Sequence, residues 1–287
     1  MSKQKKSRAT PAKRKNFAKG KNSDGIARHS SERGSAPTQK GPPWLYGRHA
    51  VIAALSNPKR NCLRLVASDD FVKAHGEELR TALAATERKR PETEILTRQE
   101  IEDLIVSGVH QGIALQLDPL PRTTLEDILP ELAERDSAVI VALDQATDPQ
   151  NIGAILRSAA AFGAQGVIIP DKNAPEVTAA MAKAACGALE RLPFIRVTNL
   201  SRSLDQLKEE GFWSVGLDGY AETTLSKIDL KGKTVLVMGS EGTGLRRLTR
   251  EKCDFLAKIP ISQAVESLNL SNATAVSLYE IARQKEG

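Results

Sequence analysis

Six stretches of the chain are mostly apolar, without a regular alternation of hydrophobic and polar positions. They cover residues 138–143, 166–170, 193–197, 213–218, 234–239 and 255–260. Runs of this kind are typical of parallel β-strands that are covered on both faces, and helical patterns separate most of them. The alternation predicts an α/β fold in which helices cover both faces of a parallel sheet, with ligands bound at the carboxyl ends of the strands.

A smaller mixed pattern precedes this region, between residues 44 and 117. Val51, Ile52 and Leu55 have helical spacing, and their helix is expected to end at the Ser-Asn-Pro turn that begins at Ser56. After it we expect strands and helices in alternation, at 62–68, 71–86, 94–97, 98–108 and 110–117. These elements predict a compact α/β module, called the small module below. Residues 118–136 contain three prolines and are predicted to form a linker with one short helix.

Length and composition narrow the classes of protein. The 287 residues are 40% hydrophobic, enough to bury the core of one large or two modest domains. No run of about 18 apolar residues occurs, and the N-terminus lacks the apolar segment of a signal peptide. We therefore expect neither membrane insertion nor secretion, and the cytoplasm is the expected compartment. The three cysteines lie far apart and the four histidines do not cluster with them, which argues against a metal site or a disulfide framework.

Charge is distributed unevenly along the chain. Residues 1–43 hold 12 Lys or Arg and two acidic residues, a net charge of +10, so the remaining residues carry −4 of the total +6. The segment has few large apolar side chains, so burial cannot offset the entropy lost on ordering, and we expect a disordered basic tail. Such a tail can bind nucleic acid by releasing counterions from the phosphates. A solubilising or targeting role is the alternative.

The first strand end with unusual residues covers 144–163. A helix is expected to open near Asn151, with Pro149 just before it and Asp148 as its cap. Arg157 has no such structural use, because its neighbours are small or apolar. Either it has an anionic partner, or it is a surface arginine whose stem covers apolar residues.

A glycine-rich turn at 237–247 follows the fifth apolar run. It lacks the Lys-Ser/Thr pair of a Walker loop and the third glycine of the dinucleotide fingerprint. Its glycines allow the backbone to approach a ligand closely, whereas Glu241 among them disfavours a phosphate. A positively charged ligand such as a sulfonium cofactor fits better. The alternative is a plain tight turn with an exposed Glu241.

The third segment is Glu-Ser-Leu-Asn-Leu-Ser-Asn at 266–272. It precedes a C-terminal helix whose expected apolar face consists of Ala275, Val276, Leu278, Tyr279 and Ile281. Ser271 or Asn272 can cap this helix. Ser267 and Asn269 are then left over, and in an extended stretch both point to one side while the two leucines point to the other.

Together these three segments resemble the SpoU branch of the SPOUT RNA 2'-O-ribose methyltransferases. The family's first motif, with Asn, Gly, Arg and a terminal Phe-Gly, is found as Asn151, Gly153, Arg157, Phe162 and Gly163. The second, Gly-x-Glu-Gly-x-Gly-Leu, is found at 239–245, and the third, Ile-Pro and then Ser-Leu-Asn-x-Ser, at 259–260 and 267–271. The small module is similar to the family's RNA-substrate-binding module. Within the branch, the combination is most similar to the enzymes that methylate a guanosine of large-subunit (23S) rRNA.

The resemblance implies an organisation and a set of ligands. It gives an RNA substrate-binding domain at 44–117 and a SPOUT methyltransferase domain with a C-terminal trefoil knot at 137–287, while the disordered basic tail at 1–43 and the linker at 118–136 are expected from composition. The implied cofactor is S-adenosylmethionine without a metal, the substrate is RNA, and the protein is a homodimer with its active site at the dimer interface. The implied cofactor-binding residues are Gly239, Gly242, Ile259, Ile261, Leu268 and Leu270.

The implied reaction is attack of a ribose 2'-hydroxyl on the methyl group of a sulfonium. By the resemblance, Arg157 stabilises the developing alkoxide, and the residues that orient the reacting groups are Asn151, Glu241, Ser267, Asn269 and Ser271. Arginine is a poor base, which leaves the adjacent phosphate or water as the proton acceptor. Two alternatives stay open: a 2'-O-methyltransferase that acts on tRNA, and an RNA-binding ribosome-assembly factor without catalytic activity.

Overall fold

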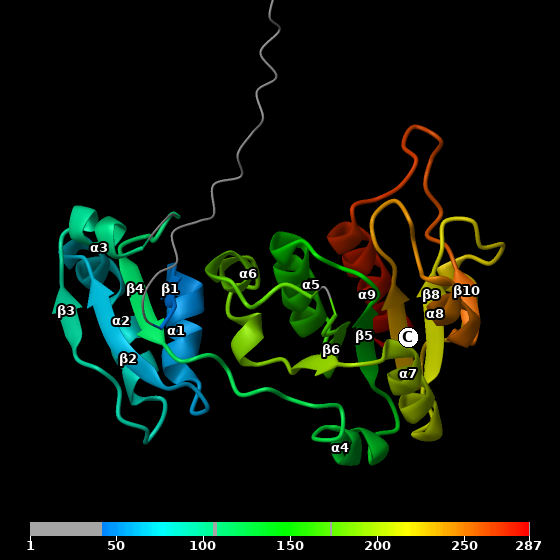
Figure 1. Cartoon of the computed structure of the whole chain (residues 1–287), viewed down its shortest axis with the longest axis horizontal. Helices are drawn as coiled ribbons and strands as arrows, with labels where there is room; N and C mark the ends of the chain where they lie inside the picture. The colour runs from blue at the N-terminus through cyan, green and yellow to red at the C-terminus, as the bar shows by residue number, and fades with distance from the viewer. Residues whose placement is uncertain (1–41, 106–107, 173, 287) are drawn as a thin grey trace, which may run out of the picture. The chain divides into compact units, whose positions relative to one another are not determined.

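The computed structural model of the chain describes residues 42–105, 108–172 and 174–286. A four-stranded sheet lies in the small module, and a six-stranded sheet lies between residues 139 and 257 (Figure 1). Residues 139–286 are called the large module below. The predicted basic tail at 1–43 lies outside the described residues, except for its last two positions. Along the described ranges, no helix is long and apolar enough to cross a membrane.

The six apolar runs form the six-stranded sheet. Its order is β10-β8-β9-β5-β6-β7, and all neighbours are parallel. The strands are β5 (Val139–Leu143), β6 (Gly166–Pro170), β7 (Phe194–Val197), β8 (Trp213–Leu217), β9 (Thr234–Met238) and β10 (Phe255–Ala257). The predicted strands and the parallel α/β class are confirmed. β10 ends earlier than predicted, shortly before Pro260, which has no N–H for a ladder hydrogen bond.

Helices cover both faces of this sheet, which explains why its strands are largely apolar. Val139 and Val141 of β5 belong to a core cluster shared with α5 (Pro149–Ala161) and α9 (Leu270–Glu286). Ile140 and Ala142 belong instead to a cluster shared with α7 (Leu200–Glu209). The shorter helices are α6 (Ala179–Ala184), which packs on α5, and α8 (Arg247–Lys252), which packs on α7, with 3-10 helices η1 (Ala188–Glu190) and η2 (Leu225–Lys227) in the connections.

The buried side of α9 differs from the prediction. Val276 and Tyr279, which we expected on the apolar face, are 46% and 57% exposed. Thr274 and Ser277 are fully buried instead. Each of these hydroxyls donates a hydrogen bond to the carbonyl four residues earlier, at 2.7 and 2.8 Å. A hydrophobic pattern does not count such residues, because they are polar by type although their own helix satisfies them.

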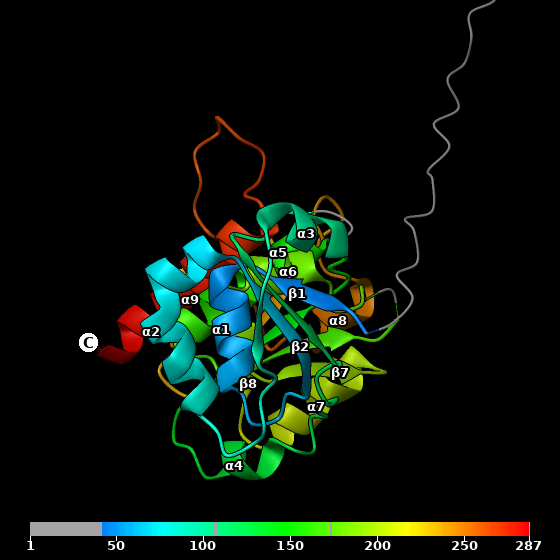
Figure 2. The same ribbon diagram turned by 90° about the vertical axis from the view of Figure 1, so that its left-hand side faces the viewer.

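The sheet of the small module has the order β1-β4-β2-β3, and this module faces the viewer in Figure 2. β4 pairs antiparallel with β1 and β2, while β3 pairs parallel with β2. Its elements are β1 (Trp44–Tyr46), α1 (Arg48–Ser56), β2 (Cys62–Ala67), α2 (Asp69–Ala84), β3 (Thr93–Ile95), α3 (Arg98–Leu104) and β4 (Ile113–Leu117). The three predicted helices and three predicted strands are confirmed. We did not predict β1, and α3 ends four residues earlier than expected.

The segment predicted as a linker packs against the large module. It contains one short helix, α4 (Leu129–Ala133), as expected. Leu125 and Leu132 are 1% exposed and belong to the core cluster on the α7 side of the sheet. Thr123 also forms an isolated parallel bridge with Ile195 of β7. This connection is therefore part of the fold rather than a loose tether.

Candidate active site

The candidate site lies at the carboxyl ends of the parallel strands. Because all six strands point the same way, the segments that follow β5, β8, β9 and β10 lie at one edge of the sheet (Figure 1). Three of these segments carry predicted site residues. Asn151 lies in the first turn of α5, Glu241 in the turn after β9, and Asn269 directly before α9.

The start of α5 fixes Asn151. The helix begins at Pro149, two residues earlier than predicted, and Asp148 caps it as expected. The carboxylate of Asp148 accepts the backbone N–H groups of Gln150 and Asn151 at 3.1 and 3.2 Å. Since the cap uses the backbone of Asn151, its side-chain amide is available for other contacts.

Glu241 joins the three segments. Its Oε1 atom accepts hydrogen bonds from Nδ2 of Asn151 at 3.0 Å, from Nδ2 of Asn269 at 2.9 Å and from the backbone N–H of Leu270 at 3.1 Å. The amide of Asn269 also donates to Oδ1 of Asn151 at 3.1 Å. A carboxylate at the start of a helix is favoured by the helix dipole. We call Asn151, Glu241 and Asn269 the amide–carboxylate cluster.

Asn269 is also the cap of α9, which corrects our assignment of the cap to Ser271 or Asn272. Its Oδ1 atom accepts the backbone N–H groups of Ser271 and Asn272, at 2.9 and 3.4 Å, and the hydroxyl of Ser271 at 2.6 Å. Asn269 precedes the first helical residue, and its own carbonyl accepts the N–H of Ala273. Asn269 is therefore the N-cap of α9. Its side-chain oxygen accepts the N–H groups of the first helical turn, and its side-chain nitrogen donates to the cluster.

The glycines after β9 are explained by the shape of the turn. Ser240 and Gly244 exchange two backbone hydrogen bonds, at 3.1 and 3.0 Å, which closes the turn on itself. A Cβ at Gly239 would lie 2.3 Å from the carbonyl carbon of Gly244. Gly242 and Gly244 have φ values of +86° and +68°, in the left-handed region that favours glycine. A tight turn therefore accounts for all three glycines. The same turn places Glu241 within hydrogen-bond distance of Asn151 and Asn269.

A buried carboxylate that we did not predict anchors this turn. Asp144, directly after β5, is fully buried and accepts the backbone N–H of Arg246 at 2.9 Å and its Nε at 2.6 Å. Asp218, directly after β8, forms a similar ion pair with Arg250 of α8 at 2.5 Å. In the sequence, the signal that could have identified Asp144 and Asp218 was the position of each directly after a strongly apolar run.

We expect Arg246→Ala to lower the free energy of unfolding by about 2 kcal/mol, because it leaves the buried Asp144 without its charged partner. Arg247→Ala is the matched control. Arg247 pairs with Glu251 on the surface, with the two side chains 75% and 55% exposed, and such pairs contribute at most about 1 kcal/mol. Urea unfolding of both variants measures the difference, and equal losses would contradict the anchoring role of Asp144.

The predicted cofactor residues differ in exposure. Ile259 and Leu268 are half-buried, and Ile261 is 41% exposed, so their side chains can contact a ligand. Leu270 is only 7% exposed and packs in the core that α5 and α9 share, so its backbone rather than its side chain faces the cluster. Ser267 is exposed, next to the cluster residue Asn269 in sequence.

Arg157 is not joined to the cluster of its own chain. It lies on α5 six residues after Asn151, which at 3.6 residues per turn places it on a different side of the helix. Its side chain is exposed, and among residues 42–105, 108–172 and 174–286 it has no hydrogen-bond or ion-pair partner. Gly153, from the same motif, faces α6 instead, where a Cβ would lie 2.4 Å from the carbonyl oxygen of Met181.

The candidate site offers amides, hydroxyls and a carboxylate. In the described part of the chain, no group of three or more His, Cys, Asp or Glu could hold a metal ion. Cys253 lies after α8, and burial, together with nearby Asp254 and Asp144, raises the pKa of its thiol to about 12. This cysteine is therefore a neutral packing residue and not a nucleophile.

The structure is an α/β protein with a cluster of polar side chains at the carboxyl edge of a parallel sheet, where such folds bind ligands. Two family models match the chain: the SpoU rRNA methylase family over residues 138–279, and the RNA 2'-O ribose methyltransferase substrate-binding family over residues 44–123. The chain belongs to the SpoU rRNA methylase family, and the resemblance inferred from the motifs is confirmed.

Several relatives are similar over most of their length. The 23S rRNA (guanosine-2'-O-)-methyltransferase RlmB of Pseudomonas aeruginosa is 42% identical over 257 residues, which cover 84% of this chain and 96% of that protein. RlmB of Escherichia coli is 41% identical, with 84% and 98% covered. The solved structure of the SpoU methyltransferase AviRb from Streptomyces viridochromogenes, in complex with the cofactor AdoMet, has a TM-score of 0.69 at 26% identity and covers 85% of this chain and 90% of that one.

Proposed function

We propose that this protein transfers a methyl group from S-adenosylmethionine to the 2'-hydroxyl of a guanosine ribose in 23S rRNA. The relatives named RlmB support the substrate, and the AdoMet complex of AviRb supports the cofactor. The observation that carries the proposal is the amide–carboxylate cluster, in which one residue from each of the three motif segments takes part. The presence of the small module favours rRNA over tRNA as the substrate.

The residues at the carboxyl edge fit a sulfonium cofactor. The partly exposed side chains of Ile259, Ile261 and Leu268 offer an apolar surface to an adenosine group, and the carboxylate of Glu241 is compatible with a positive charge nearby. We assign backbone contacts to Gly239 and Gly242 in the turn, and to Leu270. The bound cofactor would supply an electrophilic methyl group at this edge.

We also propose that the C-terminal segments form a trefoil knot. The hydrogen bonds from Asn269 and Leu270 to Glu241 support it, because the turn after β9 and the segment before α9 lie side by side although α8 and β10 come between them in sequence. In such a knot the segment at 258–269 passes the turn at 239–245, and the two line one pocket.

Within the site, each group has a separate task. We assign to Arg157 the stabilisation of the negative charge that develops on the 2'-oxygen. Asn151, Glu241 and Asn269 keep the turn and both helices in fixed positions, and Ser267 and Ser271 orient the ribose. The proton of the hydroxyl passes to the adjacent phosphate or to water, because a guanidinium stays protonated. Most of the rate enhancement then comes from holding the hydroxyl oxygen, the methyl carbon and the sulfur in line.

A homodimer is part of the proposal. Arg157 is exposed and lies apart from its own chain's cluster, so a second copy would bring it to a complete site. Val276 and Tyr279 on α9 are exposed apolar residues next to α5, and the ring of Tyr279 contacts Phe162 edge to face, with centroids 6.1 Å apart. Two exposed apolar side chains on one face of α9, beside the partly buried ring of Phe162, are typical of an interface that a partner covers.

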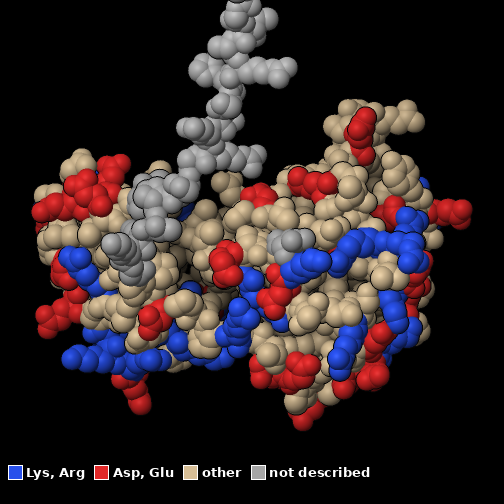
Figure 3. All heavy atoms as spheres, viewed as in Figure 1, with Lys and Arg blue, Asp and Glu red and all other residues tan. Residues whose placement is uncertain are grey.

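The small module and the basic tail are assigned to RNA. On the face drawn in Figure 3, Lys and Arg side chains lie over both modules among acidic ones, and these cations can contact RNA phosphates. The tail at 1–43, with its net charge of +10, would add contacts with little sequence preference. Since the proposed substrate is rRNA, we assign the protein to the cytoplasm.

The purified protein is expected to bind S-adenosylmethionine without a metal, because its site offers apolar and backbone groups rather than metal ligands. Calorimetric titration measures this in two buffers, one with EDTA and one with Mg²⁺, and the same affinity is expected in both. ATP and NAD are the control ligands, since the turn has neither the Walker nor the dinucleotide pattern. Binding of NAD or ATP, with no heat from S-adenosylmethionine, would refute the proposed function.

A further inference from the structure

The small module and the large module share one continuous hydrophobic core. Val51 and Leu55 of α1 belong to the same buried cluster as Met181 of α6 and Leu189 of η1. Each of these four residues is at most 4% exposed. Modules that move independently bury separate cores, so this shared cluster indicates a fixed contact surface between the two.

The backbones at this surface approach too closely for side chains. A Cβ at Gly187, just before η1, would lie 2.7 Å from the Cβ of Ala53 in α1. The contact between α6 and α5 is equally close, because a Cβ at Gly153 of α5 would lie 2.4 Å from the carbonyl oxygen of Met181 in α6. Helix α1, the α6–η1 segment and α5 therefore form one tightly packed stack. The stack ends in the helix whose first turn carries Asn151.

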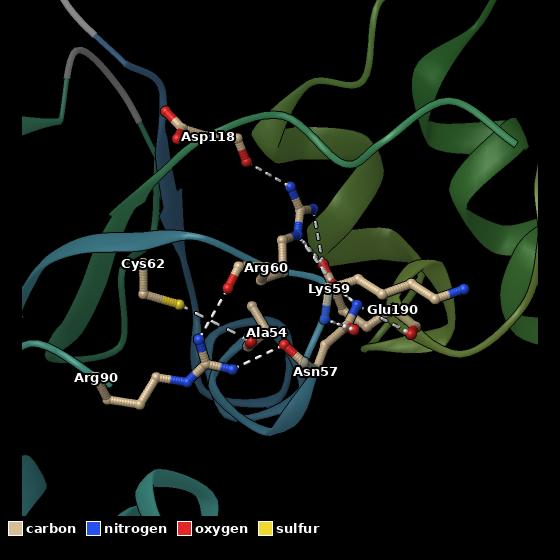
Figure 4. Close-up of polar contacts among 8 residues, drawn as sticks. All are labelled: Ala54, Asn57, Lys59, Arg60, Cys62, Arg90, Asp118 and Glu190. Carbon is tan, nitrogen blue, oxygen red and sulfur yellow. Dashed lines mark hydrogen bonds and ion pairs between the residues drawn. The ribbon is translucent and has the colours of Figure 1, made fainter. Parts of the chain in front are cut away.

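A buried ion pair lies at this contact (Figure 4). Arg60, between α1 and β2, donates from Nη2 to Oε1 of Glu190 at 2.7 Å, and from Nε to both carboxylate oxygens at 3.1 and 3.0 Å. Both side chains are only 3% exposed. Asn57 donates to Oε2 of Glu190 at 2.7 Å, and Nη1 of Arg60 donates to the carbonyl of Asp118 at 2.9 Å. The carboxylate of Glu190 is thus held from several directions by the small module.

A second arginine holds the loop that carries Arg60. Arg90 lies between α2 and β3, and its guanidinium donates to the carbonyls of Leu55, Asn57 and Arg60 at 2.8, 2.7 and 2.8 Å. Figure 4 shows this guanidinium directed into the loop from the side of the small module. The loop is therefore fixed within the small module, so the orientation of Arg60 is transmitted to the whole module.

The ion pair gives this contact a direction as well as strength. Hydrophobic packing alone is non-directional, whereas a guanidinium and a carboxylate with several hydrogen bonds accept only one relative orientation. A rotation of one module that kept the contact closed would leave the two charges buried without their hydrogen-bond partners, which is strongly unfavourable. The pair Arg64–Glu94 lies within the small module, with side chains 39% and 46% exposed. It therefore neither orients the two modules nor leaves a buried charge when it is broken.

We propose that Arg60 and Glu190 are positioning residues that hold the small module in one orientation on the large module. RNA bound by the small module then presents one particular ribose to the amide–carboxylate cluster. This inference rests on the proposed function, because it assigns the small module to RNA. It makes the Arg60–Glu190 pair responsible for RNA presentation and gives it no part in cofactor binding.

The test compares Glu190→Gln with Glu94→Gln in the full-length protein. Both changes remove one carboxylate from an Arg–Glu pair, but only Glu190→Gln leaves a buried arginine without its counter-charge. We expect Glu190→Gln to raise the KM for 23S rRNA fragments about tenfold, because the apparent affinity falls in proportion to the fraction of molecules whose modules have the binding-competent orientation. The affinity for S-adenosylmethionine should stay at the wild-type value in both variants, and the KM of Glu94→Gln should stay within about twofold.

A second measurement reports the orientation itself. Spin labels are attached at Arg80→Cys in α2 and at Arg202→Cys in α7, both exposed, with the three native cysteines replaced by alanine. We expect a narrow distance distribution in the otherwise unchanged protein and in Glu94→Gln, and a broad one in Glu190→Gln. A narrow, unchanged distribution in Glu190→Gln would overturn the proposal, and so would a broad distribution with an unchanged KM for RNA.

Ala53→Leu provides an independent variant if Glu190→Gln does not fold. Its larger side chain would enter the close contact with Gly187 and push α1 away without a change of charge. The same broad distribution and raised KM are expected. If the unmodified protein methylates no RNA, the proposed function fails, while the distance measurement still decides whether the pair fixes the modules.

Discussion

Replacement of Arg157 by Ala is expected to lower the rate of methyl transfer by about 10² or more, because it removes the group that stabilises the developing alkoxide. In the described part of the chain this guanidinium is exposed and has no partner. Its removal breaks no internal hydrogen bond, so we expect the stability and the S-adenosylmethionine affinity to stay close to the wild-type values. The effect should therefore be seen in kcat at saturating cofactor and RNA.

Two variants make this result specific to Arg157. Arg157→Lys keeps the charge but loses the planar fork that contacts two oxygens at once, so it should recover only part of the activity. Arg202→Ala removes another exposed arginine, from α7 on the opposite face of the sheet, and should stay within a few-fold of wild type. Activity of folded Arg157→Ala within a few-fold of wild type would show that this arginine is the surface residue of the alternative interpretation.

The central strands of the large module could be predicted because β5, β6 and β9 are buried on both faces. Val139 to Leu143 is the clearest case, since every residue of the strand is buried and the run has no polar interruption. β1 gave no such signal, because its strand character depends on pairing with β4. The order of the strands in the sheet also depends on such pairings, which a linear pattern does not contain.

The sequence motifs identified the candidate site residues, but they did not predict which residues these side chains contact. Alternation in the 266–272 segment singled out Asn269, yet its capping of α9 depends on where the helix begins, which sequence gives only to within a few residues. The Asp144–Arg246 and Arg60–Glu190 pairs join residues 102 and 130 positions apart. No local pattern relates such residues, so buried pairs of this kind appear only once the fold is known.

Mixed dimers are expected to recover activity from two inactive variants. One chain carries Arg157→Ala, and the other carries Asn269→Asp, which keeps an acceptor for the cap of α9 but loses the amide that donates to Asn151 and Glu241. If Arg157 serves the site of the partner chain, a mixed dimer collects both defects in one site and leaves the other site complete. With random pairing about half of the dimers are mixed, so activity should return to roughly one quarter of wild type.

The control pair consists of Asn269→Asp and Glu241→Gln chains. Glu241 and Asn269 hydrogen-bond within one chain, so every site of a mixed dimer keeps one of the two defects, and no recovery is expected. Dimers purified through two different affinity tags allow each pair to be assayed as a pure heterodimer, in which the Arg157→Ala and Asn269→Asp pair should reach about one half of wild type. If that heterodimer is as inactive as the control, each chain supplies its own arginine. The side chain of Arg157 would then have to reach the cluster of its own chain from a different side of α5.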